Sequence, residues 1–359
     1  MRSLTYAAAL REGLEQAMAV DPSVIVIGEG VPDPKAIFGT TAGLIDRFGP
    51  QRVFDMPLSE NGLTGVCIGA AMCGMRPVMI HQRIDFALLA MDQLVNNAAK
   101  WHYMFDGKAS VPMVVRTIIG RGWGQGPQHS QGLHGLFAQV PGLKVVAPST
   151  PHDAKGMLLA AIKDPNPVLF VEHRWLHGVA DDVPEDSYEV PIGEARVMRE
   201  GQPDGVTIAS LSYATLEALE AAKALSQHLR LEVEVIDLRS VRPLDHACVM
   251  RSVCKTGRLL VIDPAFESGG ISGELVCRVT QDAFDSLKAA PVRICLPDHP
   301  VPTSPHLTEH YYPGPQEIAD AVMRLMQLPK TGEGYLDLRH ALQRKGRHDV
   351  PHRDFSGPF

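Results

Sequence analysis

One carboxylate stands at a point in the sequence where chemistry is possible. Glu60 lies in the motif Ser59-Glu60-Asn61-Gly62, between a strand-like segment and an apolar, glycine-rich helix predicted over 63–74. A carboxylate at such a junction is well placed to face a cleft. A glutamate at the beginning of a helix also complements the helix dipole, which is a structural role. The residues alone favour the structural role and leave a catalytic one open.

A second candidate region is the loop from 120 to 131, where glycine recurs too often for a regular helix or strand. Such a loop can bring its backbone close to a ligand. It has neither the Gly-Lys-Ser/Thr ending of a nucleotide triphosphate loop nor the spacing of a dinucleotide-binding fingerprint, so a phosphate cradle is not indicated. His129 lies in this loop, and by itself it is more often a structural histidine than a catalytic one.

The elements that must position these residues alternate between short apolar runs and longer segments of helical period. This alternation is typical of a mostly parallel α/β sheet. We expect residues 1–190 to form one such domain. Its clearest elements are strands at 24–28, 114–120, 143–147 and 168–172, and a helix over 150–162.

A polar, acidic stretch at 179–186 has too few apolar residues to hold a core together, and we interpret it as a linker. A second, smaller α/β domain is predicted over 195–328, with strands at 206–211, 233–238 and 259–262. From 329 the apolar pattern fails. We expect residues 329–359 to be a tail that is mobile or bound by a partner.

Composition excludes several classes of protein. The chain has 359 residues, of which 45% are hydrophobic and 21% charged, as in an ordinary globular protein. A net charge of −7 provides no basic face for nucleic acid. No apolar run approaches the roughly 18 to 20 residues of a membrane span, and no secretory signal is evident. These features predict a cytoplasmic protein that binds neither nucleic acid nor membrane.

Several motifs occur in the order and spacing of one family. They are Ser-Glu-Asn-Gly at 59–62, Asp-Phe-Ala at 85–87, Met-Asp-Gln at 91–93 and Pro-Gln-His-Ser-Gln at 127–131. Together they resemble beta subunits of thiamine-diphosphate-dependent 2-oxo acid dehydrogenases. The resemblance continues from residue 4 to about 328 through further motifs, at 140–148, 164–168, 236–239 and 242–245.

The resemblance implies an α/β fold of two doubly wound domains, a transketolase-like pyrimidine-binding domain followed by a transketolase carboxy-terminal domain. It also implies roles for three residues. Glu60 would hydrogen-bond N1′ of the cofactor's aminopyrimidine and so promote the tautomer that deprotonates the thiazolium ring. Phe86 would pack on the pyrimidine. His129 would stabilise the charged intermediate or assist acyl transfer toward a lipoyl group.

The resemblance further implies metal ions and partners. Ala161, Asp164 and Asn166 match positions that hold a structural potassium ion in some relatives, although an ordinary Asx turn explains them equally. Magnesium for the diphosphate normally comes from a Gly-Asp-Gly motif, which this chain lacks. We therefore expect a separate alpha subunit to bind the magnesium, an alpha-two beta-two heterotetramer, and a lipoyl acyltransferase core.

The substrate is left open by the residues. Pyruvate is favoured over branched-chain 2-oxo acids and acetoin, and a pathway-specific acyl or aldehyde transferase is an alternative. A decayed, non-catalytic scaffold is disfavoured because Glu60, Phe86 and His129 are all present. The second half of a split transketolase is disfavoured by the motif at 127–131.

Overall fold

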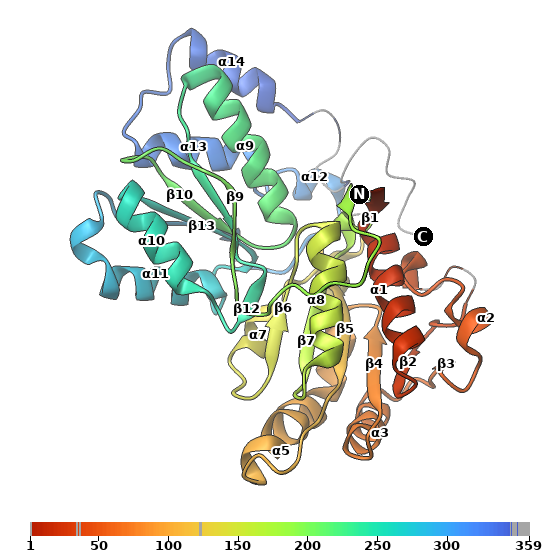
Figure 1. Cartoon of the computed structure of the whole chain (residues 1–359). Coiled ribbons are helices and arrows are strands. Elements are labelled where there is room, and N and C mark those ends of the chain that lie inside the picture. The colour runs from red at the N-terminus through yellow and green to blue at the C-terminus, as the bar shows by residue number, and fades with distance from the viewer. Residues whose placement is uncertain are drawn as a thin grey trace.

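The structure, a computed structural model, describes residues 2–33, 35, 37–121, 124–344, 346 and 350. It consists of two α/β domains that lie side by side (Figure 1). The first carries a seven-stranded sheet and the second a five-stranded sheet, and most neighbouring strands in both are parallel. The predicted fold class is confirmed.

The first sheet has the strand order β12-β6-β7-β5-β4-β2-β3. All of its pairings are parallel except that of β12 with β6. Parallel strands covered on both faces are apolar throughout, which explains the continuous runs in the sequence. The strands are β2 (Val24–Gly28), β3 (Val53–Phe54), β4 (Arg76–His81), β5 (Val114–Ile119), β6 (Lys144–Val146), β7 (Val168–His173) and β12 (Ser240–Arg242).

Two helical layers bury the two faces of this sheet. Successive strand residues alternate between them, so Val26 packs in the core under α1 and α8, and Ile27 in the core under α3. Thr5 caps α1 and Thr150 caps α8, each accepting a hydrogen bond from a backbone N–H in the first turn. The helices are α1 (Tyr6–Val20), α2 (Leu44–Phe48), α3 (Glu60–Met72), α4 (Ile84–Ala87), the π-helix η3 (Asp92–Ala98), α5 (Ala99–Met104), α6 (Gly126–His129), α7 (His134–Ala138) and α8 (Pro151–Lys163), with short 3-10 turns η1 (Ile37–Gly39), η2 (Leu88–Ala90) and η4 (Arg174–Leu176).

The second domain has the strand order β14-β13-β10-β11-β9. Helix α9 packs against this sheet, and its buried alanines let it approach closely. The strands are β9 (Arg196–Arg199), β10 (Thr207–Ser210), β11 (Glu234–Asp237), β13 (Leu259–Phe266) and β14 (Val292–Leu296). The helices are α9 (Tyr213–Leu229), α10 (His246–Thr256), α11 (Ile271–Asp282), the 3-10 turn η5 (Phe284–Ser286), α12 (Pro305–Thr308), α13 (Pro315–Leu325) and α14 (Glu333–Leu342).

The stretch interpreted as a linker is partly a strand. Strand β8 (Ala180–Val183) pairs antiparallel with β1 (Arg2–Thr5), and Val183 is buried. Three acidic or small side chains of β8 are exposed, which is why the sequence reads as polar. The chain also returns once to the first sheet, because β12 pairs with β6 after β11 has been completed in the second domain.

Residues expected to form a tail contain a packed helix. Tyr335, Leu338 and Leu342 of α14 are buried in the core that α9 and α13 share. Their spacing of three and four residues gives one apolar stripe, which the charged residues between them mask. Residues 333–342 of the expected tail therefore pack on the second domain of this chain. No helix in the described ranges is long and apolar enough to cross a membrane.

Candidate active site

Glu60 begins α3 and lies just beyond the carboxyl end of β3. Its residue is 7% exposed, and its carbonyl oxygen accepts a hydrogen bond of 2.7 Å from Thr64 Oγ1. The carboxylate itself has no hydrogen-bond partner among the described residues. Burial, and then the charges of Glu60 and Asp55, raise the pKa of Glu29, which follows β2. Three carboxylates therefore lie near one another at this edge of the sheet.

His129 is oriented by a neighbouring carboxylate. Its Nδ1 lies 2.8 Å from Oδ2 of Asp85, and its ring centroid lies 5.5 Å from that of Phe86. Because the carboxylate accepts, Nδ1 carries the proton and Nε2 is left as an acceptor. The His129 side chain is 39% exposed, so it remains within reach of a ligand.

The structure thus brings His129 and Phe86 together through Asp85. Sequence reasoning quoted Asp85 within a motif but did not predict it as a site residue. Its position directly before Phe86 was the available signal. Glu60 lies at the same edge of the sheet, two strands away, and no described hydrogen bond or ring contact joins it to this group.

These side chains all lie beyond the carboxyl ends of parallel strands. Glu29 follows β2, Glu60 follows β3, Asp85 and Phe86 follow β4, and His129 follows β5. In open α/β sheets, ligands bind in the crevice at this edge. The arrangement can hold a heterocycle by one carboxylate and one aromatic face, and it can exchange a proton through an oriented imidazole.

Two buried arginines at the same edge were not predicted. Arg83 is 5% exposed, and its two terminal nitrogens have no hydrogen-bond partner among the described residues. Burial, and then the like charge of Arg174, lower the pKa of Arg83 to about 10. Both guanidinium carbons face the ring of Phe38, at 5.8 and 4.3 Å from its centroid. Neither arginine occurs in a motif that the resemblance used.

Cationic side chains from two strands contact the turn at 161–166. Arg76 donates to the carbonyl oxygens of Ile162 (2.7 Å) and Asp164 (3.4 Å), and Lys144 forms an ion pair with the Asp164 carboxylate. The Asp164 carboxylate also accepts from the backbone N–H of Asn166 at 2.9 Å, which is an Asx turn. The carbonyl oxygen of Ala161 accepts a hydrogen bond from the backbone N–H of Asp164. The oxygens of this turn are therefore engaged by donors of the chain itself, and we assign no potassium ion here.

Comparison with known proteins agrees with the fold. Residues 2–178 match the pyrimidine-binding domain of transketolase, and residues 193–318 match the transketolase C-terminal domain. A split-gene transketolase, described as an inactive beta4 tetramer, superimposes with a TM-score of 0.73 at 22% identity. That structure covers 90% of this chain and is itself covered over 99% of its length, so it shows the fold. The class is therefore a transketolase-like α/β protein.

Relatives with higher sequence identity identify the family within this class. The beta subunit of acetoin:2,6-dichlorophenolindophenol oxidoreductase from Cupriavidus necator is 43% identical over 91% of this chain and 98% of its own length. The pyruvate dehydrogenase E1 component subunit beta-2 of Oryza sativa is 40% identical over 90% of this chain and 86% of its own length. This chain belongs to the family of beta subunits of thiamine-dependent dehydrogenase E1 components, as its motifs predicted. These relatives are named as beta subunits, which implies an alpha subunit as partner.

The family implies thiamine diphosphate as cofactor, and the residues present fit part of it. The carboxylate of Glu60 has lone pairs free for a ring nitrogen, and the half-buried ring of Phe86 provides an apolar face. Among the described residues, no group of three or more His, Cys, Asp and Glu side chains could hold a metal ion.

Proposed function

We propose that this chain is the pyrimidine-binding half of a thiamine-diphosphate site in a 2-oxo acid dehydrogenase-type complex. The observation that carries the proposal is the placement of Glu60, Phe86 and the Asp85–His129 pair at one carboxyl edge of the first sheet. A partner alpha subunit supplies the groups that hold the diphosphate and its magnesium ion, in an alpha-two beta-two assembly.

Each residue has one role in this proposal. Thiamine diphosphate, when bound, would supply a nucleophilic thiazolium carbon for a carbonyl group and a cationic ring that can take up the electron pair of the cleaved carbon–carbon bond. Glu60 hydrogen-bonds the pyrimidine nitrogen N1′ and shares its proton. Phe86 packs on the pyrimidine face. His129, held by Asp85, exchanges a proton with the substrate oxygen or with the acceptor at Nε2.

We further propose a small 2-oxo acid, pyruvate, as substrate, with the acyl group passing to the lipoyl group of an acyltransferase core. Acetoin is the second candidate. The relatives from Cupriavidus necator and Bacillus subtilis, at 43% and 41% identity, are both named as acetoin oxidoreductase subunits. Both substrates are small, so the distinction needs an assay.

The test uses the complex reconstituted with its alpha subunit, assayed with pyruvate, branched-chain 2-oxo acids and acetoin and with an artificial electron acceptor. We expect Glu60→Gln to lower kcat by about three orders of magnitude or more, because the variant no longer shares a proton with N1′. Glu200→Gln, an exposed glutamate of the second domain, is the matched control and should retain activity. Full thiamine-dependent activity in Glu60→Gln would overturn the proposal.

A further inference from the structure

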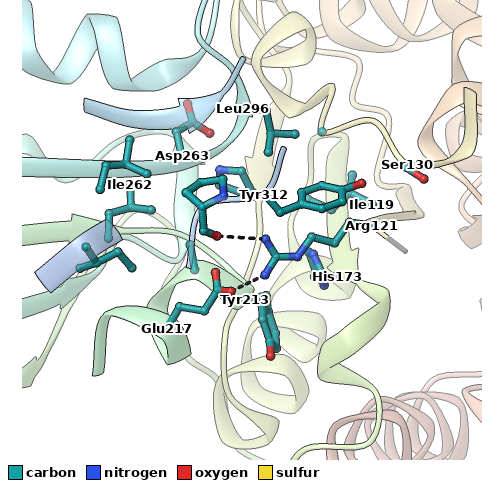
Figure 2. Close-up of a pocket in the computed structure, with 17 residues that line it drawn as sticks. Ile119, Arg121, Ser130, His173, Tyr213, Glu217, Ile262, Asp263, Leu296 and Tyr312 are labelled. Atoms are coloured by element: carbon teal, nitrogen blue, oxygen red, sulfur yellow. Dashed lines mark hydrogen bonds and ion pairs between the residues drawn. The ribbon is translucent and has the colours of Figure 1, made fainter. Parts of the chain in front are cut away.

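The loop that carries His129 is anchored at its beginning on the second domain. Arg121 forms an ion pair with Glu217 of α9 and donates to the carbonyl oxygen of Pro313 at 3.2 Å (Figure 2). Its guanidinium carbon lies 5.6 Å from the ring centroid of Tyr213 and 4.8 Å from that of Tyr312. Arg121 and Glu217 are both buried, so this contact excludes solvent.

The end of the same loop is anchored by a buried histidine. His134 donates from Nε2 to Asp263 Oδ1 at 2.9 Å, and neither residue is more than 2% exposed. Asp263 lies in β13 of the second domain. It accepts two more hydrogen bonds, from the backbone N–H groups of Ala265 and Ser272, each 3.1 Å long. The carboxylate is thereby fixed by three donors, which makes it a rigid acceptor.

On both sides of His134, the backbone lies directly against the second domain. A Cβ atom on Gly132 would lie 2.3 Å from the carbonyl oxygen of Pro264, and one on Gly135 would lie 2.9 Å from that of Gly269. Side chains cannot occupy these positions without moving the backbone. Gly132 and Gly135, which directly follow the glycine-rich loop at 120–131, therefore allow close packing between the domains.

The first domain contacts this loop as well, because the guanidinium carbon of Arg121 lies 4.5 Å from the ring centroid of Trp175. His129 itself contacts Asp85 and Phe86, and helix α6, on which it lies, is only 4 residues long. The loop is described at 121 and 124–134, and its two strongest anchors are Arg121 and His134, eight residues before and five residues after His129.

We propose that the second domain positions His129. Arg121 and His134 are positioning residues. Their partners in the second domain, Glu217 and Asp263, fix the loop in the place where His129 can form its hydrogen bond with Asp85. In the proposed function the second domain thus takes part in setting the active-site geometry. The inference rests on that function only for the role of His129.

The decisive variant is Asp263→Asn in the reconstituted alpha–beta complex. Asparagine keeps the shape but presents an uncharged and partly donating group to His134. We expect kcat to fall about tenfold or more while the KM for thiamine diphosphate stays within about twofold, because Glu60 and Phe86 are not held by this anchor. Asp298→Asn, an exposed aspartate of the same domain, is the control and should leave kcat unchanged.

A double-mutant cycle separates positioning from general destabilisation. If Asp263 acts through the contact between His129 and Asp85, then the double variant Asp85→Asn/Asp263→Asn loses little more activity than Asp85→Asn alone. Independent effects would multiply instead, and that result would overturn the proposal. Glu217→Gln at the other anchor repeats the cycle if Asp263→Asn fails to assemble with the alpha subunit.

The result also distinguishes this inference from the proposed function. Unchanged kcat in both anchor variants, in a complex that Glu60→Gln inactivates, would refute the positioning role and leave the function intact. Full activity of Glu60→Gln would refute the function itself.

Discussion

Buried charged side chains have different surroundings at the carboxyl edge of the first sheet and at the junction with the second domain. At the edge, the Glu60 carboxylate and the terminal nitrogens of Arg83 have no hydrogen-bond partner among the described residues. At the junction, Asp263 accepts three hydrogen bonds, and Arg121 has both Glu217 and a carbonyl oxygen. Each charged side chain of the junction thus has a partner, and only single atoms there, Nε of Arg121 and Nδ1 of His134, have no hydrogen-bond partner among the described residues. Unpaired buried charge is costly, so at the edge it points to a ligand.

This difference teaches which polar groups are structural. A junction charge that loses its partner destabilises the fold or moves the loop that it holds. An edge charge that is removed leaves the fold of the chain unchanged and removes activity. The following predictions test this division, beginning with the largest expected effect.

After Glu60→Gln, replacement of His129 gives the largest loss of activity. We expect His129→Ala to lower kcat of the reconstituted complex by about 100-fold or more, the range lost when a positioned proton-transfer group is removed. The thermal midpoint should stay within a few degrees of the unchanged chain, because the side chain is exposed on one side. His306→Ala, which removes a largely exposed histidine, is the control. If His129→Ala lowered the thermal midpoint by much more than a few degrees, His129 would belong to the structural groups.

Helix α14 should contribute substantially to stability. Leu338 is 1% exposed in the core shared with α9, so Leu338→Ala should cost about 2–5 kcal/mol of unfolding free energy. Leu336→Ala, on the exposed face of the same helix, should cost far less. Equal midpoints in urea for the two variants would mean that residues 333–342 do not pack as described.

Asp237 should make stability fall as the pH rises. Burial, and then the charge of Asp153, raise the pKa of Asp237 to about 7, against opposing hydrogen bonds from Ser149 and the backbone. A carboxyl whose pKa is raised on folding stabilises the folded state at low pH, and that contribution is lost as the pH rises through about 7. Asp237→Asn should therefore gain stability relative to the unchanged chain between pH 5 and pH 8, measured by thermal unfolding. A constant difference would contradict this pKa.

The smallest effect concerns potassium. Arg76 donates hydrogen bonds to carbonyl oxygens of the turn at 161–166, and Lys144 forms an ion pair with its carboxylate. Replacing NaCl by KCl at equal ionic strength should therefore leave the thermal midpoint unchanged. Arg76→Gln should cost about 1–3 kcal/mol, the usual value of hydrogen bonds from a charged donor. A midpoint that rises in KCl alone would show that an ion is bound after all.

Much of the fold could be predicted from the sequence. Strands such as β2 and β7 are continuous apolar runs, and α8 begins with a threonine cap followed by proline, so local signals define them. Strand β8 and helix α14 could not be recognised, because their apolar residues are few and are separated by charged ones. Burial of these residues depends on partners distant in sequence, namely β1 and α9.

The candidate site was predicted only in part. Glu60, Phe86 and His129 were identified through motif order, since each residue alone suits an ordinary structural role. Arg83 and Asp85 both follow β4 and come just before Phe86, so their place in the sequence was a signal, whereas Arg174 follows β7 and its spacing gives no sign that it lies near Arg83. The anchors Glu217 and Asp263 lie in the other domain, 96 and 129 residues away from the loop residues that they bind.

The most direct test of the central claim is to measure thiamine-diphosphate binding and turnover for this chain alone, for the alpha subunit alone and for the mixture. The account predicts tight, magnesium-dependent binding and thiamine-dependent turnover only in the mixture, with the substrate identified among pyruvate, branched-chain 2-oxo acids and acetoin. Turnover by this chain alone would contradict the account, because it would mean that the chain itself holds the diphosphate and its metal ion.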